Sequence, residues 1–150
     1  MKNVILFIII FLLSINQFLT AQDYQNSQDS GDLIIIVNGL KNSKGDVQLG
    51  LFNSEESFNG EQRKFKGVIL KVENKMVKWE VKNVPFGEYA IKTFHDEDQD
   101  DEIDTNFIGI PTESYGFSNN AKGLFGPPSF EKAKFHFDKH NMQITINLNK

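Results

Sequence analysis

The residues best suited to chemistry lie in one acidic segment, FHDEDQDDEIDTNF, which runs from Phe94 to Phe107. Seven of the nine residues from Asp96 to Asp104 are carboxylates. Asp96, Asp98, Asp100 and Asp104 alternate at positions 1, 3, 5 and 9, so a curled loop can bring their side chains together. Carboxylate and carbonyl oxygens are the ligands that Ca²⁺ takes in proteins. The spacing therefore predicts a calcium site.

Other residues of the segment fit a calcium loop to different degrees. The backbone carbonyl of Glu102 occupies the position that commonly completes such a loop, and Ile103 is the apolar residue expected to hold the loop on the core. Asp101 stands where glycine is usual, but aspartate tolerates the positive φ required there. No glutamate follows at position 12, so Glu113 is the candidate for an additional ligand. The pattern resembles the calcium loops of EF-hands and of aspartate-rich extracellular repeats.

Two other interpretations of the acidic segment remain open. It can be a bare, solvated turn of a metal-free structural module, although crowded carboxylates repel one another when no cation is present. It can also supply the paired acids of a cell-surface glycan hydrolase, which needs two carboxylates in contrasting environments. No nucleophile motif or phosphate-binding loop is present, and we expect no enzymatic activity. The adjacent His95 is expected to be a partly exposed side chain at a strand end.

The segments of sequence that must position this loop have the residue pattern of β-strands. MVKWEVKNV and MQITINL alternate strictly between apolar and polar residues, which predicts strands with one buried face. LIIIVNGL is continuously apolar and predicts a strand buried on both faces. Together with DVQLGLF, VILKVEN, EYAIKTF and AKFHFD these segments predict an all-β fold, an antiparallel seven-stranded β-sandwich of the immunoglobulin or transthyretin-like type. Residues 54–67 are expected to form a loop with one helical turn.

A long segment from Thr105 to Phe130 interrupts the strand pattern. It is rich in glycine and proline, yet it also contains many apolar and aromatic residues. Unstructured loops of this length are uncommon in compact domains and are usually functional or disordered. We expect an ordered lid that packs against the sandwich, with Tyr115 and Phe117 as candidates for an interaction surface.

The N-terminal residues indicate export. Lys2, the apolar run from Val4 to Ile15 and the small residue Ala21 form the pattern of a signal peptide at 1–21. A flexible leader is expected at 22–31 and the β-sandwich domain at 32–150. We therefore predict a periplasmic or secreted protein with no membrane insertion after cleavage. An uncleaved N-terminal anchor is the alternative.

Composition limits the partners. The chain has 16 basic and 20 acidic residues, a formal net charge of −4, which argues against nucleic acid as a partner. It has no cysteine, so neither a disulfide nor a lipoprotein anchor is expected. We expect a calcium-stabilised binding or interaction module whose partner is a protein or glycan of the cell envelope.

The segments FHDEDQDDEIDTNFIGIPTESYGFSNN and GPPSFEKAKF resemble the signature of the domain of unknown function family 2141, found in exported bacterial proteins. The resemblance extends over roughly Leu33 to Leu148. It implies an exported β-sandwich domain and no established activity. The family commonly has glycine where this chain has Asp101.

Overall fold

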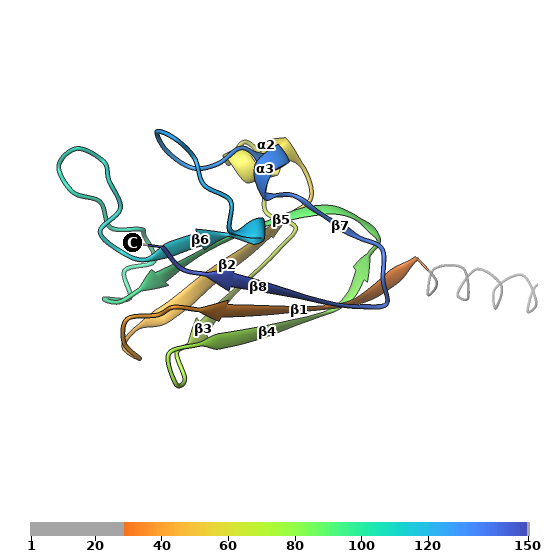
Figure 1. Cartoon of the computed structure of the whole chain (residues 1–150), viewed down its shortest axis with the longest axis horizontal. Coiled ribbons are helices and arrows are strands. Elements are labelled where there is room, and N and C mark those ends of the chain that lie inside the picture. The colour runs from red at the N-terminus through yellow and green to blue at the C-terminus, as the bar shows by residue number, and fades with distance from the viewer. Residues whose placement is uncertain (1–28, 150) are drawn as a thin grey trace, which may run out of the picture.

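The computed structural model describes residues 29–149, which form two β-sheets packed face to face (Figure 1). The predicted all-β sandwich is confirmed, with eight strands rather than seven. The strands are β1 (Ser30–Asn38), β2 (Asp46–Phe52), β3 (Lys66–Lys71), β4 (Val77–Pro85), β5 (Gly87–Asp96), β6 (Tyr115–Phe117), β7 (Phe135–Phe137) and β8 (Asn141–Asn147). The predicted signal peptide at 1–21 lies outside the described residues. So does most of the predicted leader, although β1 already begins at Ser30.

The first sheet has the strand order β4-β1-β8. β1 is antiparallel to β4 but parallel to β8, so the prediction of a wholly antiparallel sandwich is wrong at this pair. The burial of β1 also differs from its prediction. Leu33, Ile35 and Val37 are fully buried, whereas Ile34 and Ile36 are only half-buried, because this sheet is packed mainly on one face.

The second sheet has the order β3-β2-β5-β6, and β7 pairs with the beginning of β5. Its inner face supplies Val47, Leu49, Leu51 and Ile91, which are at most 2% exposed. These side chains pack against those of the first sheet in one core. Burial of a branched or aromatic side chain contributes roughly 1.5–3 kcal/mol, so this core is the main source of stability.

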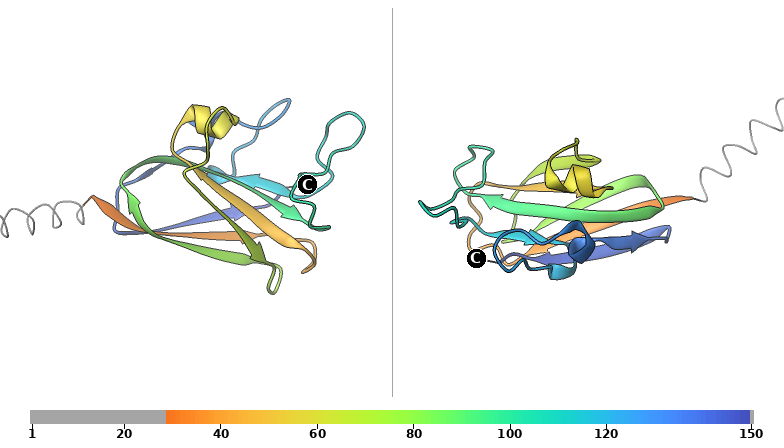
Figure 2. Two further views of the ribbon diagram at one scale, coloured as in Figure 1. Left: turned by 180° about the vertical axis from the view of Figure 1, so that it is seen from behind. Right: turned by 90° about the horizontal axis from the view of Figure 1, so that it is seen from above.

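The outer face of the second sheet carries a second, smaller apolar cluster. It is covered by the short helices α2 (Glu55–Asn59) and α3 (Phe130–Ala133), which contact each other above β5. Figure 2 shows both helices on this side of the molecule. Phe58 and Phe130 pack with their ring centroids 5.8 Å apart, and Phe117 of β6 joins them. The 3-10 turn η1 (Ser118–Asn120) follows β6 directly.

Helix α2 confirms the helical turn expected in residues 54–67. Ser54 caps its N-terminus by accepting a hydrogen bond from the Ser57 N–H, and the Ser57 hydroxyl accepts one from the Ser54 N–H. Gly60 ends the helix with a φ of 87°. A capping box of this kind holds a short helix that has little propensity of its own. Within residues 29–149 no helix has the length and apolar character needed to cross a bilayer.

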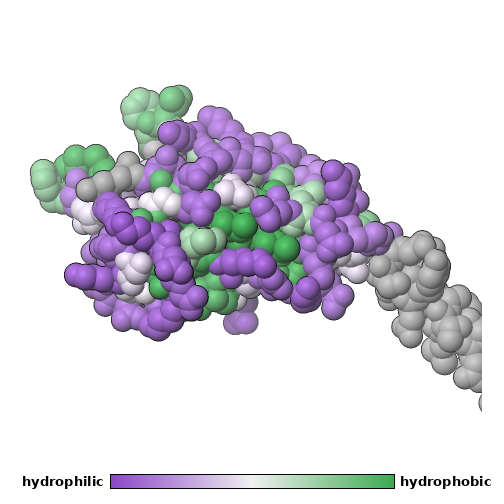
Figure 3. Space-filling view, turned by 60° about the horizontal axis from the view of Figure 1, so that its bottom comes forward, coloured by the Kyte–Doolittle hydropathy of each residue, from purple (hydrophilic) through white to green (hydrophobic). Residues whose placement is uncertain are grey.

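The lid from Thr105 to Phe130 packs less than predicted. Tyr115, Phe117 and Phe130 do pack on the sheet, but two loop tips expose their apolar residues to solvent. Phe107 is 97% exposed and Phe125 is fully exposed at 103%, and their neighbours Ile108 and Leu124 are exposed too. Figure 3 shows these apolar tips protruding beyond a largely hydrophilic surface.

Candidate functional site

Strand β5 leads directly into the acidic loop, and its last two residues are buried. His95 is fully buried, so the prediction that it is partly exposed is wrong. The residue faces the inner side of the sheet, opposite Val47, and its Nε2–H donates to the Lys44 carbonyl at 2.7 Å. Its Nδ1 lies 3.9 Å from a carboxylate oxygen of Glu97. His95 therefore anchors the base of the acidic loop.

Asp96 organises the turn that follows. Its Oδ1 accepts from the Gln99 N–H at 2.7 Å and from the Asp100 N–H at 3.3 Å. Its Oδ2 accepts from the Asp101 N–H at 3.1 Å and from the side-chain amide of Gln48 at 3.1 Å. A carboxylate offers about four acceptor positions. Asp96 therefore uses its acceptor capacity mainly to hold the loop closed.

The backbone of the loop is tightly curled. Gln99 and Asp101 have φ values of 66° and 69°, in the left-handed region. The positive φ expected at Asp101 is thus present without glycine, as the sequence predicted. The Gln48 side chain of β2 also donates to Asp101 at 2.9 Å, which supports this conformation.

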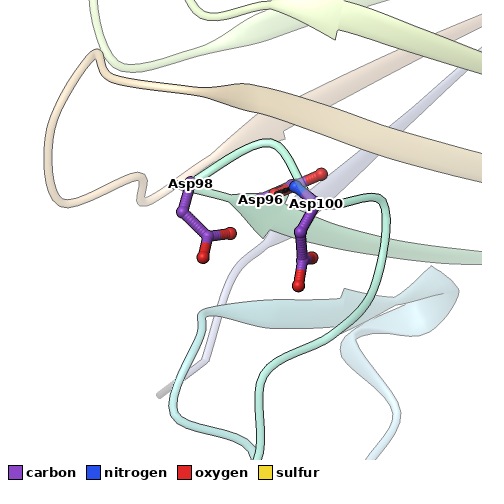
Figure 4. A group of neighbouring side chains, drawn as sticks. All are labelled: Asp96, Asp98 and Asp100. Carbon is purple, nitrogen blue, oxygen red and sulfur yellow. Dashed lines mark hydrogen bonds between the residues drawn. The ribbon is translucent and has the colours of Figure 1, made fainter.

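The carboxylates of the loop and that of Glu113 form two overlapping groups, each with oxygens within 4.8 Å of one another. The first contains Asp96, Asp98 and Asp100, and Figure 4 shows the latter two extending from the loop toward the same side. The second contains Asp98, Asp104 and Glu113. Asp98 belongs to both, so it is the centre of the acidic cluster.

Glu113 reaches the cluster because residues 104–113 form a small hairpin. Thr105 bridges Pro111, and the Thr112 N–H donates to the Asp104 carbonyl at 2.8 Å. The buried Glu113 carboxylate accepts from the Glu97 N–H at 2.8 Å and from the Asp104 N–H at 3.2 Å. It therefore ties the start of the acidic loop to its end.

The second group has the more available acceptor positions. The Glu113 oxygens accept one bond each, whereas those of Asp96 accept two each. Loss of solvent, together with the charges of Asp100, Asp104 and Asp96, raises the pKa of Asp98 above its ordinary value. This repulsion is what a bound cation would relieve. The geometry therefore favours Asp98, Asp104 and Glu113 as cation ligands over Asp96.

The remaining predicted site residues add no side-chain oxygen to these groups. The Glu102 carboxylate is exposed and belongs to neither group, its N–H donates to Asp100 at 2.9 Å, and the ligand role of its backbone carbonyl stays a prediction. Ile103 is 39% exposed and lies on the outer face of the second sheet, not in the core as expected. Tyr115 is half-buried and Phe117 is 7% exposed, and their rings are packed edge to face. Sequence reasoning missed Gln48, because a single polar residue on an alternating strand gives no signal.

Comparisons with known proteins identify a family. No curated protein and no solved structure matches the chain. One family model, described as an uncharacterized protein conserved in bacteria (DUF2141), matches residues 35–145, which include the six strands β2 to β7, parts of β1 and β8, and the acidic loop. Because this match covers most of the sequence, the chain belongs to the DUF2141 family of uncharacterized bacterial proteins.

Proposed function

We propose that the protein is an exported, non-enzymatic binding module whose acidic loop binds Ca²⁺. The observation that carries the proposal is the convergence of Asp98, Asp104 and Glu113, whose oxygens lie within 4.8 Å of one another. Asp100 is close enough to Asp98 to add a further oxygen. Three or four carboxylates, completed by water and backbone carbonyls, match the six to eight oxygens that Ca²⁺ takes.

Calcium at this position would act on the lid. Asp104 and Glu113 lie at the two ends of the 104–113 hairpin, and Asp98 lies in the preceding turn. An ion shared by the three residues links the turn to both ends of the hairpin. The hairpin carries the exposed Phe107 at its tip. The cation thus fixes the direction in which the apolar tip is presented to a protein or glycan partner.

The geometry gives less support to a glycan hydrolase. Such an enzyme needs a concave site in which one acid is kept protonated beside an ionised one. The cavity on the outer face of the second sheet is lined by no carboxylate. Asp96, the most buried acid among residues 29–149, has both carboxylate oxygens occupied by N–H donors.

The experiment is thermal unfolding of residues 22–150 with EDTA and with about 10 mM CaCl₂. For the dissociation constants of about 10⁻⁴–10⁻³ M that are common outside cells, an ion bound only by the native state stabilises it by about 1.4–2.7 kcal/mol. The melting temperature should therefore rise by several degrees. Isothermal titration calorimetry of the same protein measures the stoichiometry, expected to be one ion per chain.

Two single substitutions test the ligand set. Asp104→Asn should remove most of the calcium response, because it takes a charged oxygen from the second group. Glu102→Gln changes the same charge on an exposed side chain outside both groups, and should leave the response intact. An identical response in wild type and in Asp104→Asn, or no response in wild type, rejects the proposed site.

A further inference from the structure

A cavity of about 420 Å³ lies on the outer face of the second sheet, beyond the part that α2 and α3 cover. Its floor is formed by β2 and β5, and Phe94, Tyr115 and Phe117 contribute aromatic side chains. Gly109 and Pro111 of the 104–113 hairpin and Gly126 and Pro127 of the 121–129 loop form its walls. The volume falls in the range of small-molecule sites, about 300–1,000 Å³.

Glycines open the floor of this cavity. Gly50 of β2 pairs with Gly67 of β3 on one side and with Lys92 of β5 on the other. A Cβ at Gly67 would lie 2.6 Å from Cε of Lys64, and a Cβ at Gly50 would lie 2.7 Å from the Phe52 ring. The glycine pair therefore makes the room in which the Lys64 chain lies across the sheet.

Two lysines provide the charge of the cavity. Lys92 is half-buried, with its Nζ 4.1 Å from the centre of the Phe58 ring and hydrogen-bonded to the Phe58 carbonyl. Lys64 is exposed and lies on the other side of Gly50. Within residues 29–149 neither lysine forms a salt bridge, and no acidic residue lines the cavity. An ammonium has three donors, so Lys92 keeps two that the Phe58 carbonyl does not use.

We propose that this cavity binds a single-chain amphiphilic carboxylate of the fatty-acid class. The carboxylate pairs with Lys92 and Lys64 beside Gly50, and the alkyl chain lies against the aromatic floor between the two loops. Charge complementarity selects this ligand, because the lining is apolar except for a few polar groups and its only ionic groups are two cations. The exposed Phe107 and Phe125 lie on the loops that wall the cavity but do not line it.

The proposal is independent of the calcium site. None of Asp98, Asp104 and Glu113 lines the cavity, although the hairpin that forms one wall begins and ends at the acidic cluster. Because Ca²⁺ precipitates long-chain carboxylates, dodecanoate is titrated in EDTA and the calcium response is measured by thermal unfolding without dodecanoate, which separates the two ideas. Binding of the carboxylate without any response to calcium rejects only the metal site.

The test uses dodecanoate below its critical micelle concentration, titrated into residues 22–150 and followed by calorimetry. Lys64→Met and Lys92→Met should each weaken binding about tenfold, because a charge-assisted hydrogen bond contributes on that scale. Dodecanol, which has the same chain without the charge, should bind more weakly to the wild type and equally to both variants. Lys139→Met, an exposed lysine in the β7–β8 turn, is the charge-matched control and should bind dodecanoate like the wild type.

Several outcomes would overturn the proposal. One is the absence of dodecanoate binding to the wild type, and another is equal affinity for dodecanol. Unchanged affinity in Lys64→Met would also reject it, and that variant alters an exposed side chain, so it should fold normally. Co-sedimentation with phosphatidylglycerol vesicles without binding of monomeric dodecanoate would assign the apolar loop tips to a bilayer surface instead.

Discussion

The inner and outer faces of the β3-β2-β5-β6 sheet come from the same strands but carry different residues. On the inner face, Leu49, Leu51 and Ile91 pack against the other sheet and leave almost no exposed area. On the outer face, Gly50, Lys92 and Phe94 leave a cavity between two loops. A face that only stabilises the fold needs neither the glycine pair nor the two lysines, which form no salt bridge within residues 29–149. This difference is the reason for proposing the outer face as the binding surface.

The largest expected effect is the loss of stability when a side chain of the inner face is truncated. Leu51→Ala on the inner face should lower the free energy of unfolding by about 2–5 kcal/mol, because it leaves a cavity in a closed core. Phe94→Ala on the outer face should cost only about 1 kcal/mol, since its ring is half-buried beside an existing cavity. Urea unfolding of the two variants measures both values. Equal losses would mean that the outer face is as tightly packed as the inner one.

A smaller effect is expected where the outer layer is attached to the sheet. Ser118 is fully buried, accepts from the Ile91 N–H at 2.9 Å and donates to the Ala133 carbonyl at 2.5 Å. Ser118→Ala should destabilise the protein by about 1–3 kcal/mol, because the Ile91 N–H is left without an acceptor. Chemical denaturation gives the value, and Ser43→Ala in the exposed β1–β2 connection is the control. A loss no greater than that of the control would show that the outer layer is held by packing alone.

The acidic loop should respond to pH in the metal-free protein. The pKa of Asp98 is raised in the folded state, so the folded protein binds this proton more tightly than the unfolded chain does. The resulting contribution to the free energy of unfolding is lost as the pH rises above 3.8, the ordinary pKa of the group. In EDTA, Asp98→Asn should therefore melt at a higher temperature than the wild type, and the difference should grow between about pH 3.5 and about pH 7. Asp32, Asp46 and other carboxyl groups with lowered pKa values are present in both proteins. Their contributions to the pH dependence of stability therefore cancel when the two melting temperatures are subtracted.

Thermal melts at several pH values, followed by circular dichroism, measure this difference. With saturating Ca²⁺ the order should reverse, because the ion needs the charge that Asp98→Asn removes. A difference that is constant with pH in EDTA would mean that the raised proton affinity of Asp98 is not coupled to folding.

The smallest effect is expected at the loop tips. Phe125→Ser should change the free energy of unfolding by less than about 0.5 kcal/mol, because the ring is fully exposed and contributes nothing to the core. The same substitution should weaken any partner that binds through this tip. Urea unfolding checks the first part, and a clear loss of stability would show that the tip packs against the body of the protein in solution.

The strands were predictable where alternation is long, as in β4 and β8, whose polar and apolar residues follow the two faces. The three-residue strand β6 was not, because Tyr115–Phe117 is too short to show a period. The second apolar cluster escaped prediction for another reason. Phe58 is the only apolar side chain that the five-residue helix α2 contributes, so no apolar stripe exists to reveal the helix.

The candidate site was predictable in position but not in detail. The alternating acids identified the loop, and Glu113 was named as an additional ligand because the expected glutamate at position 12 is Phe107. The saturation of Asp96 by N–H donors could not be predicted, because it depends on the backbone path and on Gln48 of another strand. The exposed aromatic tips were expected to pack, and general burial tendencies fail at residues that the fold leaves on protruding loops.

The pairing of β1 with β8 has a consequence for how the chain acquires its structure. The first described strand cannot complete its sheet until the residues from Asn141 onward have been made, because β8 is its parallel neighbour. Such distant pairing slows folding, since a long loop must close before the contact forms. A chain still emerging from the ribosome therefore lacks a finished sandwich until its last strand has been made.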